Sequence, residues 1–268
     1  MEQSIQILTS CTGRKARASS NALTWEDFRE EDEYIRTRER ELQEEMLPAR
    51  EMYTGRQHEH LMKGVQTLRG SEEAVSVDVS IVSAGYGVVD EERMVAPYDL
   101  TFSEMSRREA RSWAREQGIP SDVRKTLRKN ADVHIVLLGT AYLDAARLIG
   151  GDREDWKVSG RALFLCSRSA AKGIGGRSGC LAVGLTNDHA REWGEGLVGL
   201  KGLIARQLLL ARASGEAILS DEEAGGAEAF LNRLHDSKDD RPPSPFEGQN
   251  LEEIASGGRQ TRLFENGS

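Results

Sequence analysis

Five short apolar segments recur along the chain, each followed by a polar or glycine-containing stretch. Val75–Val82 alternates apolar and polar residues and is β-branched, which favours a strand. Val133–Leu138 is almost continuously apolar, as in strands covered on both faces. The other segments are Ile5–Leu8, Ala162–Cys166 and Leu181–Leu185. The pattern predicts five strands.

Helical patterns fill most of the intervals between these segments. A charged helix is predicted at residues 25–46, with too few apolar residues for the core, so we expect an exposed insertion. The other predicted helices are Ala49–Leu68, Ser103–Lys129 with a break near Gly118–Pro120, Tyr142–Ile149, His189–Ala213 and Glu228–His235. Alternating strands and helices predict a three-layer α/β fold, with a mostly parallel central sheet and helices on both faces.

The chain has 268 residues, which suits a single α/β domain, and we place this domain at residues 1–215. Beyond residue 215 the composition becomes acidic and proline-containing. Residues 216–268 are therefore predicted to be a C-terminal segment that is flexible in part.

Composition narrows the setting of the protein. No apolar run approaches the roughly 20 residues that span a bilayer, and the N-terminus does not have the pattern of a signal peptide. The three cysteines (Cys11, Cys166 and Cys180) fit no even disulfide framework, which predicts a reducing cytoplasm. The histidines lack metal-ligand spacing, so no metal or cofactor is predicted. We expect no membrane contact and favour a monomer.

The candidate chemistry lies after the strands. Parallel sheets bind ligands at the carboxyl ends of their strands, where the strand order reverses. The segments Ser10–Lys15, Ser83–Thr101, Gly139–Tyr142 and Ser167–Lys172 are therefore expected to form one site. Gly173–Gly176 does not have the dinucleotide-binding glycine spacing and is predicted to be a mobile loop.

Ser10–Lys15 combines hydroxyls, a thiol, a glycine and two cations. These groups suit an anion, although the spacing is not that of a P-loop and a plain turn remains an alternative. A nucleophilic role for Cys11 would need a base that the sequence does not identify.

Ser83–Thr101 carries the sharpest signal. Tyr86 and Tyr98 have rings that can stack on a planar ligand, and Asp90 and Asp99 supply carboxylates. The alternative is a structural loop with buried tyrosines and capping aspartates.

The net charge is −8, yet Arg107–Lys129 contains eight basic and three acidic residues. Local clustering of positive charge favours contact with a nucleic-acid backbone despite the overall negative charge.

Three motifs carry a resemblance to a known family. Ser83–Asp90 followed by Pro97–Thr101 resembles the YaaA family of peroxide-stress proteins. With Ser10–Lys15 and Ala49–Gly55, the chain looks still closer to a poorly characterised sister family from bacteria and phages. The resemblance extends over Ile5–Leu210. A similar glycine loop and Tyr-Asp pair occurs in archaeosine-synthase-type domains, whose core is similar to that of uracil-DNA glycosylases.

This resemblance implies a uracil-DNA-glycosylase-like fold and a protein directed at nucleic acid. Some phage-defence DNA glycosylases, which excise glucosylated hydroxymethylcytosine, have the same general build. The implied function is excision of a modified base from phage DNA. The sequence lacks the Gly-Gln-Asp-Pro-Tyr and His-Pro-Ser motifs of ordinary uracil-DNA glycosylases, so it does not identify the catalytic group.

Three functions stay open on this basis. A glycosylase would take the base out of the stack, and a carboxylate would stabilise the sugar cation. A YaaA-like protein would bind DNA without catalysis, and a nucleoside hydrolase or transferase would use the same pocket. For the glycosylase we assign catalysis to Asp99 and Asp90; substrate binding to Ser10, Cys11, Thr12, Lys15, Ser83, Gly85, Tyr86, Gly87, Tyr98 and Thr140; and the DNA backbone to Arg14, Arg107, Arg108, Arg124, Lys125 and Arg128.

Overall fold

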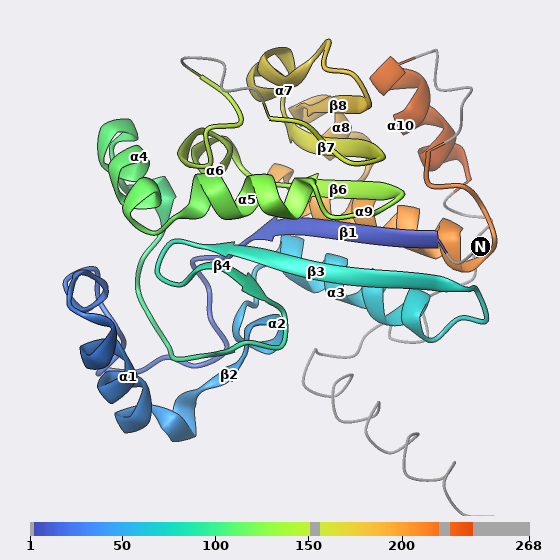
Figure 1. Cartoon of the computed structure of the whole chain (residues 1–268). Coiled ribbons are helices and arrows are strands. Elements are labelled where there is room, and N and C mark those ends of the chain that lie inside the picture. Colours follow the sequence, from blue (N-terminus) through green and yellow to red (C-terminus); the bar gives the residue numbers. More distant parts are fainter. Residues whose placement is uncertain (1–2, 151–155, 220–225, 238–268) are drawn as a thin grey trace, which may run out of the picture.

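A central sheet organises the chain, and the computed structural model describes residues 3–150, 156–219 and 226–237 (Figure 1). The strand order is β4-β3-β1-β6-β7-β8, in which β4 alone runs antiparallel to its neighbour. The bounds are β1 (Gln3–Ser10), β3 (Val75–Ser83), β4 (Gly87–Asp90), β6 (Val133–Leu137), β7 (Arg161–Ser167) and β8 (Cys180–Leu185), with a separate pair formed by β2 (Leu47–Pro48) and β5 (Met94–Val95). The five predicted strands are confirmed; β2, β4 and β5 were not predicted.

Helices cover both faces of the sheet, which confirms the three-layer α/β fold. α3 and α9 pack against each other on one face, and α5 packs on the other face against β1, β3 and β4 (Figure 1). The α-helices are α1 (Asp32–Glu41), α2 (Ala49–Met52), α3 (Arg56–Arg69), α4 (Arg107–Glu116), α5 (Ile119–Leu127), α6 (Thr140–Ala145), α7 (Arg168–Ile174), α8 (Asn187–Glu192), α9 (Leu197–Ala213) and α10 (Gly226–Asp236). Three 3-10 helices are η1 (Asp27–Arg29), η2 (Gln43–Glu45) and η3 (Phe102–Glu104).

The strand order reverses beside β1. The chain passes from β1 to β3 on one side, then crosses to β6 on the other side of β1 and continues outward to β7 and β8. The connections that leave the carboxyl ends of β1 and β6 therefore diverge. This is the position where doubly wound sheets bind ligands.

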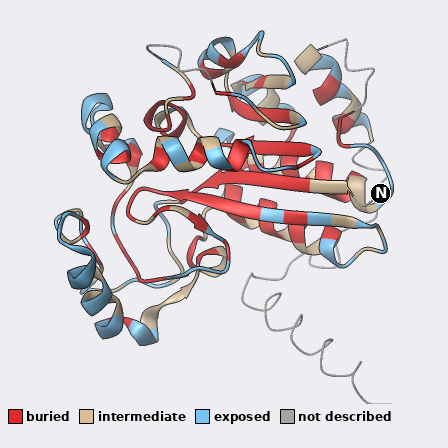
Figure 2. Ribbon diagram, in the orientation of Figure 1, coloured by how far each residue is buried: buried red, intermediate tan, exposed pale blue. Residues whose placement is uncertain are grey.

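The middle of the sheet is the core of the molecule. β1 is buried from Ile5 onward and β6 is buried at every position (Figure 2). On one side of the sheet, α3 and α9 approach so closely that a Cβ on Gly202 would lie 2.1 Å from the carbonyl oxygen of Gln57. Because Gln57 and Gly202 lie in the early turns of their helices, this contact holds the two N-terminal ends side by side.

The predicted charged helix at residues 25–46 is shorter than expected. Only α1 is α-helical, and none of its residues is buried; η1 and η2 flank it. The insertion is nevertheless anchored, since Phe28 and Leu42 are buried. The backbone of Leu23 also accepts a hydrogen bond from Asp99 and donates one to Pro97.

Three other predictions need correction. The helix predicted at Ala49–Leu68 breaks between α2 and α3, and the helix predicted at His189–Ala213 breaks between α8 and α9. Gly194 lies in the latter break with a φ of 64°, a conformation that favours glycine. Gly173 is not in a mobile loop, because α7 continues to Ile174, whose side chain is fully buried.

The α/β domain extends past residue 215. α10 packs against β8 and α9, and it buries Phe230, Leu231 and Leu234. The boundary expected at residue 215 is therefore too early, whereas the proline-containing stretch lies outside the described residues. Within the described ranges, no helix is both long and apolar enough to cross a membrane. The cytoplasmic setting stays a prediction.

Candidate functional site

A cavity of about 520 Å³ opens at the point where the strand order reverses. Its walls come from the loop after β1, the N-terminal ends of α3, α6 and α9, η3, and the carboxyl ends of β7 and β8. The lining residues are Ser10, Cys11, Thr12, Gly13, Arg14, Gly55, Gln57, Thr101, Ser103, Gly139, Thr140, Tyr142, Cys166, Ser167, Leu185, Leu197, Val198 and Lys201.

The side chain of Gln57 bridges the two central strands beside the cavity. β1 and β6 last pair at Thr9 and Leu137. Gln57 Nε2 donates hydrogen bonds to Thr9 Oγ1 (3.0 Å) and to the carbonyl oxygen of Leu137 (2.9 Å). The amide of Gln57 therefore satisfies one acceptor from each strand at the point where β1 and β6 separate. These bonds hold the N-terminal end of α3 against the carboxyl ends of the two strands.

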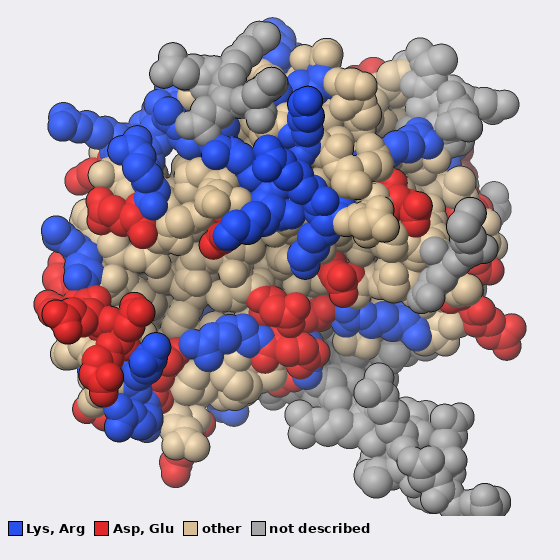
Figure 3. Space-filling view, in the orientation of Figure 1, with Lys and Arg blue, Asp and Glu red and all other residues tan. Residues whose placement is uncertain are grey.

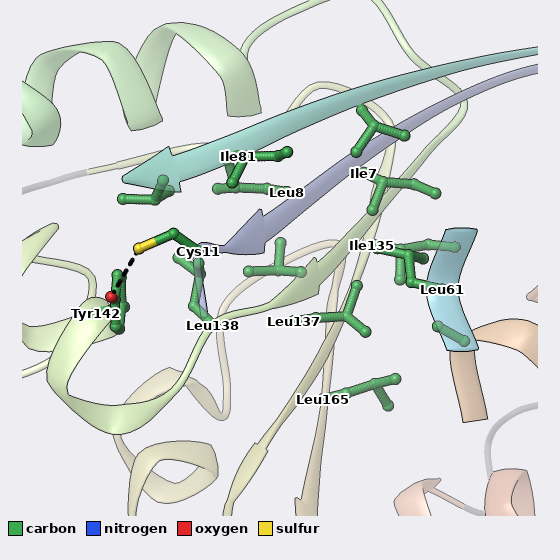
Figure 4. Close-up of a cluster of buried hydrophobic side chains, with 14 of the residues drawn as sticks. Ile7, Leu8, Cys11, Leu61, Ile81, Ile135, Leu137, Leu138, Tyr142 and Leu165 are labelled. Atoms are coloured by element: carbon green, nitrogen blue, oxygen red, sulfur yellow. Dashed lines mark hydrogen bonds between the residues drawn. The ribbon is translucent and has the colours of Figure 1, made fainter. Parts of the chain in front are cut away.

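A second hydrogen-bonded group lines the side of the cavity next to β1. Cys11 Sγ lies 3.0 Å from the hydroxyl of Tyr142 (Figure 4), and Thr101 Oγ1 lies 3.2 Å from the same hydroxyl. Burial raises the pKa of Tyr142 well above its ordinary value. The phenol therefore stays protonated at neutral pH and offers a neutral hydroxyl to the cavity.

Lys201 is the most unusual side chain of the site. It lies in the first turns of α9 and lines the cavity. Among the described residues, none forms a hydrogen bond or an ion pair with its ammonium group. Burial lowers the pKa of Lys201 to about 8, and the nearby Cys166 opposes this effect. The pKa of Cys166 is itself raised by burial to about 11, so the thiol is protonated at neutral pH.

The cavity favours an anionic or electron-rich ligand. Of the described residues that line it, Arg14 and Lys201 are cationic and none is Asp or Glu. Thr140 Oγ1 and Ser167 Oγ lie 2.9 Å apart at the ends of β6 and β7 and add two hydroxyls. Within residues 3–150, 156–219 and 226–237, no group of three or more His, Cys, Asp or Glu side chains is placed to hold a metal ion.

The predicted tyrosine platform is a packed cluster instead. The ring of Tyr98 meets those of Phe28, Tyr86 and Tyr53 edge to face, with centroids 5.7, 5.6 and 6.4 Å away. The ammonium of Lys15 lies 4.2 Å from the centre of the Tyr98 ring. With 3% of its surface exposed, Tyr98 has no free face for a base. Stacking by Tyr98 is therefore a wrong prediction.

The hydroxyls of this cluster are also engaged. Tyr98 Oη lies 2.8 Å from Ser83 Oγ and 3.0 Å from Tyr53 Oη. Ser83 Oγ in turn accepts backbone hydrogen bonds from Gly85 and Tyr86. The motif thus holds the turn after β3 and fixes it to the insertion.

The two predicted catalytic carboxylates do not line the cavity. Asp90 is exposed at the end of β4 and accepts a hydrogen bond from the backbone of Glu92. Asp99 is exposed and lies near Lys15. Burial lowers the pKa of Lys15, and the negative charge of Asp99 acts in the opposite direction. Gly87 has a φ of 73° and turns the chain between β3 and β4. The predicted roles of Asp90, Asp99 and Lys15 in this cavity are therefore not supported.

Part of the predicted site does converge. Ser10, Cys11, Thr12 and Arg14 lie together with Thr140 in the cavity, whereas Ser83, Gly85, Tyr86 and Gly87 do not line it. Tyr142 ends the segment Gly139–Tyr142 that was expected at the site, whereas Gln57 and Lys201 were missed. A signal for Lys201 existed, because Ile204, Ala205 and Leu208 follow it at helical spacing and place it on the apolar face.

Arg14 lines the cavity, whereas the other predicted DNA-backbone cations lie on α4 and α5 or directly after α5, where Figure 3 shows Lys and Arg side chains gathered. Arg108, Lys125 and Arg128 are exposed. Arg107 is exposed as well, and it donates two hydrogen bonds to the carboxylate of Asp144, with N–O distances of 2.7 and 3.0 Å. Beside this ion pair, a second cavity of about 670 Å³ shares Ser103 and Thr140 with the first.

Residues 37–157 match the model of a family of unknown function (DUF6884). The matched stretch runs from α1 past α6, and it leaves out β1 and Lys201. No curated protein and no solved structure shows significant similarity to the chain.

Proposed function

We propose that the protein binds one nucleotide of a nucleic acid in the cavity beside β1, and that DNA is its partner. One observation carries the proposal: among the described residues, the lining supplies the cations Arg14 and Lys201 together with hydroxyls, and no carboxylate. A volume of about 520 Å³ also lies within the usual range of small-ligand pockets.

Two further observations favour DNA over a free nucleotide. α4 packs against α6, whose N-terminal end lines the cavity, so the basic residues of α4 lie beside the site. α5 continues from there toward the amino ends of the strands and extends the basic surface away from the cavity. The sequence motifs also resemble those of nucleic-acid-directed families. A polymer backbone on α4 and α5 would place one nucleotide at the cavity mouth.

The proposed reaction is cleavage of the bond between a modified base and its sugar, as expected for defence against phage DNA. An enzyme that acts on a base must first take it out of the stack. A cavity at the sheet edge supports this proposal because it can enclose one extruded nucleotide. Binding without cleavage is the second candidate, favoured by the absence of carboxylates among the described lining residues.

Binding is tested by titrating labelled duplex and single-stranded DNA over a series of salt concentrations. Affinity should fall steeply with salt, because each phosphate contact releases counterions. Replacing Lys125 and Arg128 by Ala should make the affinity less dependent on salt concentration. Lys172→Ala on α7 is the matched control and should leave this salt dependence unchanged. Equal affinity of the wild type at low and high salt contradicts DNA as the partner.

Cleavage is tested on oligonucleotides that carry cytosine, hydroxymethylcytosine or glucosylated hydroxymethylcytosine, by alkali-induced strand breaks. Breaks with one modified base support the glycosylase. Binding without breaks on any substrate supports the non-catalytic protein. Release of bases from free nucleosides, unaffected by Lys125→Ala, would instead indicate a nucleoside hydrolase.

A further inference from the structure

We propose that Lys201 is a nucleophile that forms an imine with the aldehyde of an abasic deoxyribose, which makes the protein an abasic-site lyase. This inference rests on the proposed function, because it needs a DNA sugar in the cavity beside β1. It adds an activity on DNA from which the base is already missing.

The position of Lys201 carries the inference. A partly buried amine is costly unless it is paired, yet none of the described residues gives Lys201 a hydrogen bond or an ion pair. It lines the cavity, and its Nζ lies 4.0 Å from the point where a Cβ on Gly139 would sit. The amine therefore lies next to the backbone at the carboxyl end of β6 and faces the cavity that Gly139 also lines.

The protonation state suits this chemistry. With a pKa of about 8, about one tenth of the Lys201 amine is neutral at pH 7 and about half at pH 8. An ordinary lysine has a neutral fraction of only about one in 3000 at pH 7. Desolvation of this kind activates lysine nucleophiles that attack carbonyl carbons.

The neighbouring groups can serve the proton transfers. The protonated phenol of Tyr142 and the hydroxyls of Thr140 and Ser167 line the same cavity. Each can donate a hydrogen bond to a carbonyl oxygen or to departing water.

The reaction balances without another reactant. The amine lone pair of Lys201 attacks C1′ of the open-chain sugar, and the carbonyl oxygen gains a proton. Loss of water then leaves a protonated imine. The protonated imine makes the protons on C2′ acidic. One of them passes to water, a double bond forms between C2′ and C3′, and the C3′–O bond breaks so that the 3′ phosphate leaves with the electron pair. Water hydrolyses the imine, and the amine is restored.

The test incubates the full chain with a duplex oligonucleotide that has one abasic site, in the presence of cyanoborohydride. Hydride reduction of the imine should give a one-to-one covalent adduct, which peptide mass spectrometry maps to Lys201. The adduct should form about fivefold faster at pH 8 than at pH 7, because the neutral fraction of the amine rises by that factor.

Lys201→Arg keeps a cation in the cavity but cannot form the imine, and should reduce adduct formation at least 100-fold. Lys157→Arg, at an exposed position outside the cavity, is the matched control and should react like the wild type. Lys201→Met gives a second variant without the nucleophile, and thermal unfolding checks that both variants are folded.

The outcomes separate the two proposals. Adduct at another lysine, or equal adduct in folded Lys201→Arg, overturns the lyase. Wild-type protein that binds the abasic duplex without any adduct also overturns it and leaves the proposed function standing. Failure to bind any DNA refutes the proposed function, and the lyase with it.

Discussion

Replacing Lys201 by Met should make the protein more stable while it removes the amine from the cavity. Folding transfers the charged end of Lys201 out of water, which lowers its pKa from 10.5 to about 8. Methionine has a similar length and carries no charge to desolvate. Sites built for chemistry commonly reduce stability in this way.

The magnitude follows from the pKa. When the pKa of a group differs by one between the folded and unfolded chains, the free energy differs by about 1.4 kcal/mol. The fall in the pKa of Lys201 to about 8 therefore amounts to about 3 kcal/mol. Since the side chain is partly exposed to the cavity, we expect a gain of about 1–3 kcal/mol at pH 7. For a domain of this size, the melting temperature should rise by roughly 2–10 °C.

The dependence on pH identifies the cause. Below pH 8 the folded and unfolded chains both hold the proton of Lys201, and the folded state carries the full penalty. Between pH 8 and 10.5 the unfolded chain holds more protons, so wild-type stability gains from this group as pH rises. The advantage of Lys201→Met should therefore shrink across that interval.

Urea unfolding of both proteins at pH 7, 8, 9 and 10 measures this difference. Lys172→Met, on an exposed helix, should show no such pH-dependent gain. A Lys201→Met variant that is less stable than the wild type at pH 7, or an advantage that is constant from pH 7 to 10, would refute the reasoning.

Two further predictions concern the framework around the site. Gly202→Ala should lower the free energy of unfolding in urea by about 1–3 kcal/mol, because its Cβ would lie 2.1 Å from the carbonyl oxygen of Gln57. Gly196→Ala is the control, since no atom lies within 4 Å of the Cβ it adds. Equal losses of stability in the two variants would contradict the close contact. Tyr98→Phe should cost about 1–3 kcal/mol, because it removes a buried hydroxyl that lies 2.8 and 3.0 Å from two others. Tyr34→Phe, on exposed α1, should lower the free energy of unfolding by less. If a folded Tyr98→Phe variant bound DNA tenfold more weakly than the wild type, Tyr98 would belong to the binding site after all.

The sheet was predictable because its strands follow simple patterns of burial. Val133–Leu138 is apolar throughout, and β6 is buried on both faces as that pattern requires. The helix breaks were not predictable in the same way. The residues after Met52 continue a helical pattern, but Tyr53 is drawn into a bridge with Lys15, far away in the sequence. Tertiary contact overrides local propensity there.

Only part of the candidate site was predicted correctly, namely the part that the order of the strands determines. Ser10–Arg14 and Thr140 directly follow central strands, so the topology alone places them at the sheet edge. Tyr98 and Asp99 were assigned from chemistry and resemblance. The assignment of Tyr98 did not foresee that Phe28, from the insertion, would pack against its ring. Lys201 was missed because it lies in a helix whose apolar pattern is typical of a core element.

The position of β1 has a consequence for how the protein is made. β1 pairs with β3 and β6, which are synthesised long after it, and the cavity also needs α9, which ends at Ala213. At ribosomal speeds of roughly 5–20 residues per second, a nascent chain passes about 10–40 s between completing β1 and completing α9. In the first part of that interval, until β3 and then β6 are complete, an apolar edge of β1 lacks its partner and is open to aggregation or to chaperones. The cavity is complete only when α9 has docked with Lys201, so a nascent chain that ends before α9 lacks the site of the proposed chemistry.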